Sequence, residues 1–315
     1  MSPVYFTFLQ SLAVIMGLTV LGLILRLWSV ISVNHNQLFG RLVTDLALPA
    51  LIFTSLARER LAPDELLSAA IMATALVLCI VAAWIMGRAL HLEPKTLGAF
   101  VLVASVGSSS TLGYALIAQV FPQSPAALSD VVIVSELGVV VPCFAIAVPV
   151  AIYFSQSKGY TISSAFKDYL RSPLFSSMVL GLAVSTFRLP LDSFAATILF
   201  QMLDVVGGSL AIFVARSVSL MLMPMPLRRV GPLVVGVMII TLLLKPLAAF
   251  TLSSMAHLPP LDIEILLIEA AMPAGSVAAV LAGRYGCDGA TASALVVATY
   301  GLSLLTMPLV MLLLG

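Results

Sequence analysis

Two apolar segments of this chain are each long enough to cross a lipid bilayer, and each is interrupted near its middle by small and polar residues. The first, Leu97–Phe121, contains Gly107-Ser108-Ser109-Ser110-Thr111. The second, Ile263–Arg284, contains Met272-Pro273-Ala274-Gly275-Ser276. Irregular backbone at membrane depth is tolerated only where it is enclosed by protein or lines a watery cavity. Matched interruptions in the two halves of a chain are typical of the binding site of a secondary transporter.

The composition identifies lipid as the main solvent of this chain. Hydrophobic residues make up 61% of the sequence, charged residues only 9%, and the mean hydropathy is +1.15. Soluble domains carry about 25% charged residues. A net charge of +1 gives no indication of nucleic-acid binding. The cysteines, Cys79, Cys143 and Cys287, show no metal-ligand spacing, so we expect neither a bound metal nor a cofactor.

A transmembrane helix needs about 20 apolar residues, and ten segments meet or approach that length. They are Val4–Leu27, Leu38–Ala57, Glu65–Arg88, Leu97–Phe121, Asp130–Phe154, Pro173–Phe187, Phe194–Leu222, Val230–Met255, Asp262–Arg284 and Thr291–Leu314. The sequence thus predicts an all-α membrane protein with spans 1–5 in residues 1–155, a connection at 156–172, and spans 6–10 in residues 173–315. Because five is odd, two similar halves would form an inverted repeat.

The basic residues predict the orientation of these spans. Ten Lys and Arg residues fall in the connections on one side, against three on the other. Positive residues concentrate on the cytoplasmic side, so we expect both termini outside the cell membrane. No basic stretch precedes the first apolar run. This favours a retained transmembrane helix over a cleaved signal peptide.

The two interruptions supply the candidate substrate site. Pro273 has no N–H, so the Glu269 carbonyl loses its usual helical partner, and serine side chains can cap a restarted helix. The N-terminal ends of restarted helices carry free N–H groups and positive dipoles, which suit an anion. For either break taken alone, the alternative to a binding site is a kink in a membrane helix that binds no ligand. The candidate substrate-binding residues are Ser108, Ser109, Ser110, Thr111, Tyr114, Pro273, Ala274, Gly275 and Ser276.

Five ionisable residues lie within or near the spans: Asp45, Glu136, Asp204, Lys245 and Glu269. Each is a candidate for coupling or charge compensation, because a charged group is costly at the bilayer centre. Glu269 lies one turn before Pro273, and Lys245 could contact an anionic substrate. The alternative for each is a polar contact between helices.

These motifs resemble the auxin efflux carrier family in its short bacterial form. The strongest match is Ala271–Ser276, continuing through Leu281–Gly286 to Leu304–Pro308; Leu48–Phe53 and Lys245-Pro246 also match the second and eighth helices of that family. In the fourth span, where Gly113 takes the place of the family glycine, Ser108 replaces an asparagine, Ser110 a glycine and Ala115 a proline.

The resemblance implies a five-plus-five inverted repeat, similar to sodium/proton antiporters and bile-acid symporters, with spans 4 and 9 crossing at their breaks. It implies a scaffold of spans 1, 2, 6 and 7, often dimeric, and a transport core of spans 3–5 and 8–10 that moves as an elevator. The implied substrates are small organic anions, auxin-like or dicarboxylates such as malate and malonate. It also implies a multi-pass protein of the bacterial inner membrane, whose termini are periplasmic in the orientation predicted from the basic residues.

Two other functions are alternatives to anion transport. A sodium- or proton-coupled symporter of the bile-acid type is the main alternative, because carbonyls and serine hydroxyls at the breaks suit sodium. An intramembrane enzyme is a remote alternative: the sequence has no His-Glu-x-x-His motif, and no histidine at the depth of Ser108. We therefore expect a carrier and not an enzyme, with H⁺ or Na⁺ as the coupling ion.

Overall fold

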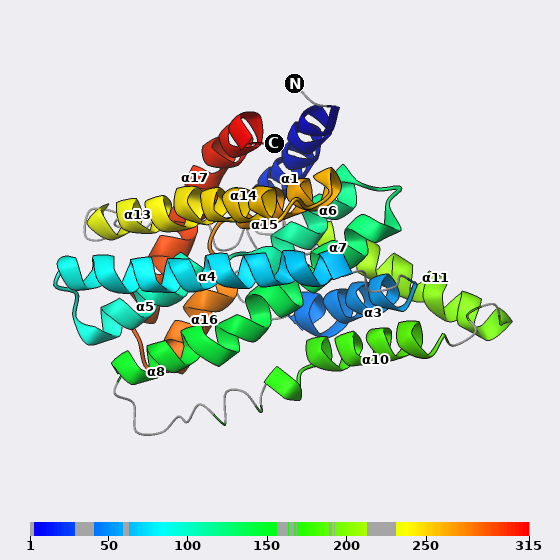
Figure 1. Cartoon of the computed structure of the whole chain (residues 1–315), viewed down its shortest axis with the longest axis horizontal. Coiled ribbons are helices and arrows are strands. Elements are labelled where there is room, and N and C mark those ends of the chain that lie inside the picture. Colours follow the sequence, from blue (N-terminus) through cyan, green and yellow to red (C-terminus); the bar gives the residue numbers. More distant parts are fainter. Residues whose placement is uncertain are drawn as a thin grey trace. The chain divides into compact units, whose positions relative to one another are not determined.

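The computed structural model describes residues 3–28, 41–58, 63–155, 163, 167, 169–188, 191, 193–212 and 231–314. Regular structure in these ranges is entirely helical, with several α-helices running into short π-helices, labelled η. The chain divides into two compact units, whose helices are labelled in Figure 1. Unit 1 comprises Met1–Ala62, Ser110–Val132 and Leu170–Met223, and unit 2 comprises Pro63–Ser109, Ile133–Tyr169 and Pro224–Gly315. Each unit thus takes helices from both halves of the sequence.

Unit 1 is built around α3, which packs against α10 and α11, while α1 packs against α6. Its elements are α1 (Pro3–Leu27), η2 (Val43–Ala47), α3 (Leu48–Arg58), α6 (Tyr114–Val120), most of α7 (Pro125–Ser135), α10 (Pro173–Phe187) and α11 (Phe194–Gly208). The π-helix η3 (Ser109–Gly113) begins at the boundary with unit 2.

Unit 2 is built around α5 and α15, whose central turns are completely buried. Its elements are α4 (Pro63–Ala89), α5 (Pro94–Ser105), η4 (Glu136–Val140), η5 (Cys143–Ala147), α8 (Val148–Ser155), α13 (Gly231–Val237), η7 (Met238–Leu244), α14 (Lys245–Met255), α15 (Pro260–Ala270), α16 (Ser276–Arg284) and α17 (Gly289–Leu314). The helix α5 packs against α4, α8, α16 and α17. The Thr241 hydroxyl joins η7 to α5 by donating to the Ala104 carbonyl at 2.9 Å.

The described helices confirm a multi-pass membrane protein. Six helical stretches among them are long and apolar enough to cross a bilayer. They are Val4–Gly22, Pro63–Ala89, Pro125–Ser155, Phe194–Ile212, Gly231–Met255 and Gly289–Leu314. Two shorter apolar helices, α5 and α10, accompany them. The first residues of the predicted span at 38–57 lie outside the described residues. Most of the predicted connection at 156–172 and the end of the predicted seventh span also lie outside them.

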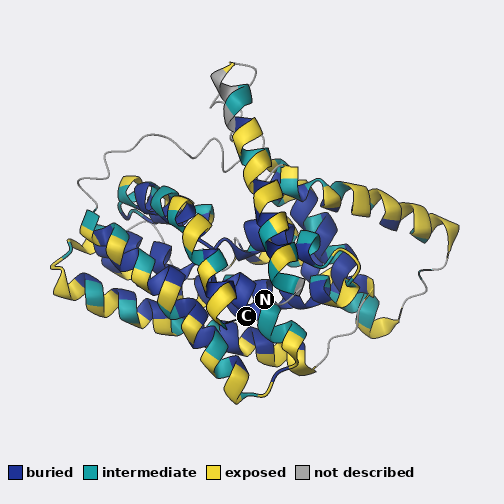
Figure 2. Cartoon of the chain, turned by 90° about the horizontal axis from the view of Figure 1, so that it is seen from above, coloured by how far each residue is buried: buried dark blue, intermediate teal, exposed yellow. Residues whose placement is uncertain are grey.

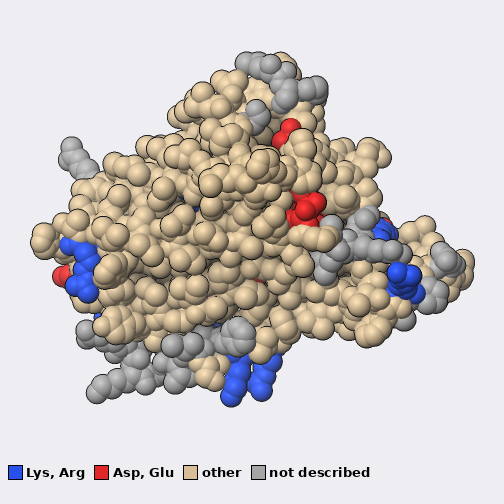
Figure 3. Space-filling model, viewed as in Figure 1, with Lys and Arg blue, Asp and Glu red and all other residues tan. Residues whose placement is uncertain are grey.

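The surface of these helices suits contact with lipid. Figure 2 shows helices whose buried faces alternate with exposed ones, and the exposed face of α4 is largely apolar, including Leu78, Val81, Trp84 and Ile85. On the face drawn in Figure 3, charged residues form a few small groups separated by broad uncharged surface. Helices that are apolar on every side are typical of a membrane environment.

Both predicted interruptions are present. The segment Leu97–Phe121 is divided where α5 ends at Ser105 and η3 begins at Ser109, and Ile263–Arg284 is divided between α15 and α16. Neither segment continues as one straight helix. The break regions therefore need partners for their peptide groups from elsewhere in the fold.

Candidate functional site

The first break begins as soon as α5 ends. Val106 donates its N–H to the Leu102 carbonyl at 3.0 Å, but its own backbone is extended, with φ −89° and ψ 109°. Ser105 strengthens this end of the helix, since its hydroxyl donates to the Val101 carbonyl at 2.7 Å. The chain then passes through Gly107 and Ser108 before helical structure resumes.

The second break forms where α15 ends ahead of Pro273. The Ala271 N–H donates to the Leu267 carbonyl at 2.9 Å, and the Met272 N–H donates to the Glu269 carbonyl at 3.3 Å. Pro273 could not supply the bond that Glu269 would accept in a continuous helix. The tighter bond from Met272 takes its place, so the Glu269 carbonyl keeps a partner.

The two breaks meet inside unit 2 as an isolated antiparallel bridge between Gly107 and Ala274. The Ser108 N–H donates to the Pro273 carbonyl at 2.8 Å, and the Gly275 N–H donates to the Val106 carbonyl at 2.9 Å. Each break thus satisfies peptide groups of the other, which removes a cost that hydrocarbon would otherwise impose. The convergence of the two breaks, expected from the sequence, is what the structure shows.

The helix α17 supports this crossing through two residues that the sequence analysis did not select. The Ala274 N–H donates to the Thr299 hydroxyl at 3.2 Å, and that hydroxyl donates onward to the Val296 carbonyl at 2.7 Å. The hydroxyls of Tyr300 and Ser108 lie 2.7 Å apart and share a hydrogen bond. Thr299 and Tyr300 are adjacent polar residues in the middle of an apolar span, and this pattern could have indicated both of them from the sequence.

Two of the five ionisable candidates lie at the crossing. Lys245 is 3% exposed, and its ammonium nitrogen would be only 2.7 Å from a Cβ added at Gly107. Glu269 is completely buried, and its carboxyl group interacts electrostatically with Lys245 and with the Ser109 side chain. A cation and a carboxyl group therefore lie within electrostatic range of each other beside the bridge.

The other three ionisable candidates lie elsewhere. Asp45 is exposed on η2 and accepts a hydrogen bond from the Thr44 hydroxyl at 2.8 Å. Glu136 is buried at the start of η4 and interacts electrostatically with Tyr169. Asp204 forms an ion pair with Arg58 in unit 1. None of these contacts involves a residue of the bridge.

The predicted substrate residues divide between the two units. Ser108, Ser109 and the Pro273–Ser276 segment belong to unit 2, with Ser276 half-buried at the start of α16. Ser110, Thr111 and Tyr114 belong to unit 1, where Tyr114 lines a pocket. The sequence could not predict this division, because the boundary falls between Ser109 and Ser110, which are neighbours in one segment.

The prediction that serine side chains cap the restarted helices is wrong for α16, whose N-cap residue is Gly275 and where no side chain makes a capping hydrogen bond. After the first break, helical structure resumes at Ser109 in η3 and continues directly into α6. The Ala278 N–H donates to the Gly275 carbonyl at 3.0 Å, and the N–H groups of Ser276 and Val277, which precede it, point out of the N-terminal end of the helix. With the helix dipole, they make the Ser276 end of α16 a favourable location for negative charge.

Comparison with known proteins places this chain in a family. The chain matches the family described as "Membrane transport protein" over residues 7–169 and 160–311. It is 23% identical over 280 residues to an uncharacterised transporter of Methanocaldococcus jannaschii, covering 87% of this chain and 88% of the relative. It is 26% identical over 302 residues to an uncharacterised transporter of Methanothermobacter thermautotrophicus, covering 95% and 96%.

These matches extend over almost the whole chain, and they include both broken segments and the helix that supports them. The sequence motifs around Pro273 and the architecture of apolar helices point the same way. The chain is therefore a membrane transporter that belongs to the auxin efflux carrier family.

Proposed function

We propose that this transporter moves a small organic anion, either auxin-like or a dicarboxylate such as malate or malonate, and binds it at the crossing in unit 2. The observation that carries this proposal is the buried Lys245 ammonium beside the Gly107–Ala274 bridge. A buried cation near the N-terminal end of α16 favours a negatively charged ligand. Hydroxyls of Ser108, Ser109 and Ser276 would then orient the carboxylate.

The same crossing supports alternating access of the elevator type. In this proposal, ten spans form a five-plus-five inverted repeat, and unit 2 carries the substrate as the transport core. Spans 1, 2, 6 and 7 serve as the scaffold through which two copies form a homodimer. Support comes from the two breaks, which fall five spans apart, and from the bridge between Gly107 and Ala274, both of which belong to unit 2.

Glu269 is the residue that we assign to coupling. Its burial beside Lys245 makes its ionisation sensitive to whether an anion occupies the crossing. Proton coupling through Glu269 is therefore the form of energy coupling that we propose, with sodium as the alternative. The transporter would lie in a bacterial inner membrane with both termini periplasmic.

Transport by proteoliposomes tests this function. Purified protein is reconstituted, and uptake of radiolabelled malonate, malate and indole-3-acetate is measured under a pH gradient and, separately, under a sodium gradient. We expect uptake of at least one anion, driven by the pH gradient. Ser276→Trp should abolish that uptake and Glu269→Gln should remove its dependence on pH.

A matched control separates a blocked site from a damaged protein. Ser254 lies exposed on α14, away from the bridge, so Ser254→Trp should transport normally. Uptake that is unchanged in both Ser276→Trp and Glu269→Gln would overturn the assignment of the site. Wild-type protein that moves none of these anions under either gradient would overturn the substrate class.

A further inference from the structure

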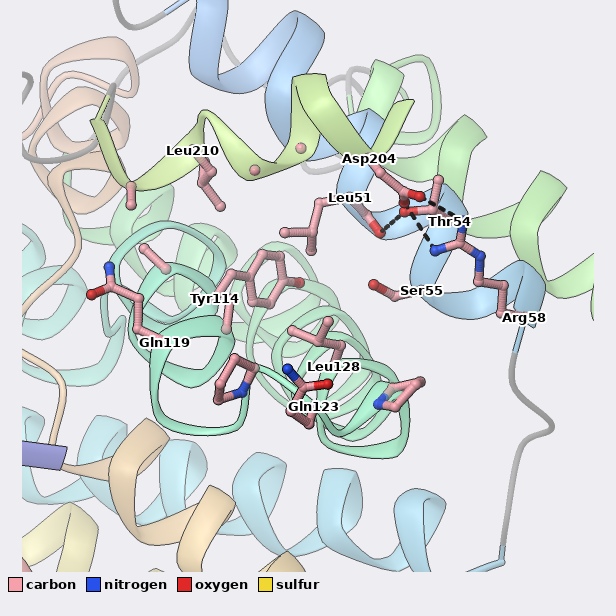
Figure 4. A pocket seen from close by; sticks show the side chains of 17 residues that line it. Leu51, Thr54, Ser55, Arg58, Tyr114, Gln119, Gln123, Leu128, Asp204 and Leu210 are labelled. Carbon is pink, nitrogen blue, oxygen red and sulfur yellow. Dashed lines mark hydrogen bonds and ion pairs between the residues drawn. The ribbon is translucent and has the colours of Figure 1, made fainter. Parts of the chain in front are cut away.

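A pocket of about 490 Å³ lies entirely within unit 1. Its walls come from α3, α6, the start of α7 with the residues preceding it, and α11 with the residues that follow. Figure 4 shows the Tyr114 ring in the middle of the pocket, with Gln119 toward one end and Arg58 with Asp204 toward the other. Ligand sites of small molecules have volumes of about 300–1,000 Å³, so the pocket is large enough to hold one.

Arg58 is the one cation among the described residues that line this pocket. Its two terminal nitrogens donate to the two carboxylate oxygens of Asp204, at 2.9 and 2.6 Å. The guanidinium carbon also lies 5.0 Å from the centre of the Phe200 ring, which itself packs against Phe53. The guanidinium plane is thus oriented with one N–H of each terminal nitrogen directed at a carboxylate.

Asp204 occupies a position that a ligand carboxylate can take. The Arg58 and Asp204 side chains are 41% and 42% exposed, so the ion pair remains open to exchange and contributes little to stability. Paired donors of a guanidinium recognise any planar carboxylate in the same manner. A second carboxylate arriving at Arg58 can therefore make the same paired hydrogen bonds that Asp204 makes.

We propose that this pocket is a recognition site for monocarboxylates with an apolar body, in which the ligand carboxylate replaces Asp204 on Arg58. The proposal rests on the proposed transport of organic anions and adds a second anion site, formed by residues of unit 1 alone. The apolar body packs against Leu51, Tyr114, Leu128 and Leu210. A dicarboxylate binds less well, because its second charge has no cation among the described lining residues and lies near the released Asp204.

The exchange makes opposite predictions for the two members of the ion pair. Removing the guanidinium removes the ligand's partner, so binding is lost. Removing the charge of Asp204 removes the internal competitor, so binding becomes tighter. An ion pair that only joined α3 to α11 would respond alike to both changes, since either one breaks it.

Calorimetry on the full-length protein in detergent measures this difference, with hexanoate as the probe and 1-hexanol and malonate as comparison ligands. We expect Asp204→Asn to tighten hexanoate binding by about threefold to tenfold, and Arg58→Gln to weaken it by at least about tenfold. The double variant should bind as poorly as Arg58→Gln. 1-Hexanol and malonate should bind more weakly than hexanoate to the wild type. Unchanged or weaker binding in Asp204→Asn would overturn the exchange.

Cysteine protection locates the bound probe. The native cysteines, Cys79, Cys143 and Cys287, are buried, so the wild type serves as the blank for a maleimide reagent. Gln123 lines the pocket and is exposed, whereas the exposed Ala126 is three residues away and does not line it. Hexanoate should slow the labelling of Gln123→Cys and leave that of Ala126→Cys unchanged. Equal labelling rates at Gln123→Cys with and without hexanoate would place the ligand elsewhere.

Anion uptake and hexanoate binding together distinguish failure of the pocket proposal from failure of the proposed transport function. If malonate or indole-3-acetate uptake requires the crossing but hexanoate binding ignores Arg58 and Asp204, the pocket proposal fails and the transport function stands. If the wild type transports no anion while Asp204→Asn still tightens hexanoate binding, the pocket proposal stands and the transport function fails.

Discussion

The Cβ that Gly275 lacks would lie 2.7 Å from the carbonyl oxygen of Gly107 and 3.2 Å from its carbonyl carbon. Both neighbouring atoms belong to the backbone, so no rotamer change could relieve the contact. The close approach also brings the Gly275 N–H to the Val106 carbonyl at 2.9 Å. Glycine at position 275 is therefore what allows the two broken helices to share hydrogen bonds.

Gly275→Ala should separate the two breaks. Overpacking of this kind costs about 1–3 kcal/mol, and here it also weakens the two hydrogen bonds of the bridge. We expect a lower midpoint of thermal unfolding in detergent and a large loss of anion uptake. Gly283→Ala is the control, because Gly283 lies on α16 with no other atom within 4 Å of its added Cβ. Equal behaviour of the two variants would show that the crossing tolerates a side chain.

Thr299→Val should leave the Ala274 N–H without its acceptor. Valine has nearly the shape of threonine but no hydroxyl, and a buried N–H without a partner costs about 1–3 kcal/mol. We expect reduced stability and reduced uptake, both measured against Thr299→Ser, which keeps the hydroxyl. If Thr299→Ser loses as much uptake as Thr299→Val, packing of the methyl group and not the hydrogen bond accounts for the effect.

Lys245→Met and Glu269→Gln should be energetically coupled. Each single change leaves one buried group without its electrostatic partner. We expect the double variant to be less destabilised than the sum of the singles by about 0.5–3 kcal/mol, measured by unfolding in SDS. Lys95→Met with Glu269→Gln is the control pair, because Lys95 is exposed. Additive effects in both pairs would show that Lys245 does not stabilise Glu269.

Asp288 should make the free energy of unfolding depend on pH in the acid range. Burial raises its pKa, but this is outweighed by hydrogen bonds from Thr291 and Ala290, so the pKa lies below its usual value. The Thr291 N–H donates to one carboxylate oxygen at 3.0 Å and its hydroxyl to the other at 2.6 Å. A folded pKa below the unfolded value of about 3.9 adds stability above that pH, which is lost as the pH falls through the folded pKa.

Asp288→Asn is the test of this contribution, with thermal unfolding followed between neutral pH and the acid limit. The asparagine still accepts the capping hydrogen bond at the start of α17 but does not titrate in this range. We expect the wild type to lose stability below about pH 4 more steeply than the variant. Parallel curves for the two proteins would assign acid sensitivity to other carboxylates.

Much of the fold followed from local sequence. The helical class and the interruptions at Gly107 and Pro273 depend on apolar length and on residues that break helices, both of which act within a few positions. The predicted capping role of the serines is wrong for α16, because Gly275 takes the N-cap position there. The five ionisable candidates could be predicted from their positions within or near apolar spans, but those positions could not separate Lys245 and Glu269 from Asp45, Glu136 and Asp204.

The sequence by itself indicated where two apolar segments are weakest as helices, since proline lacks an N–H and runs of glycine and serine favour other backbone conformations. Proline alone does not end a helix here, because Pro308 lies inside α17. Only the tertiary structure decided what satisfies the broken ends. Thr299 is 25 residues from Ala274, Tyr300 is 192 residues from Ser108, and Asp204 is 146 residues from Arg58. Local composition sets which peptide groups and charges need partners, but the packing of distant helices supplies them.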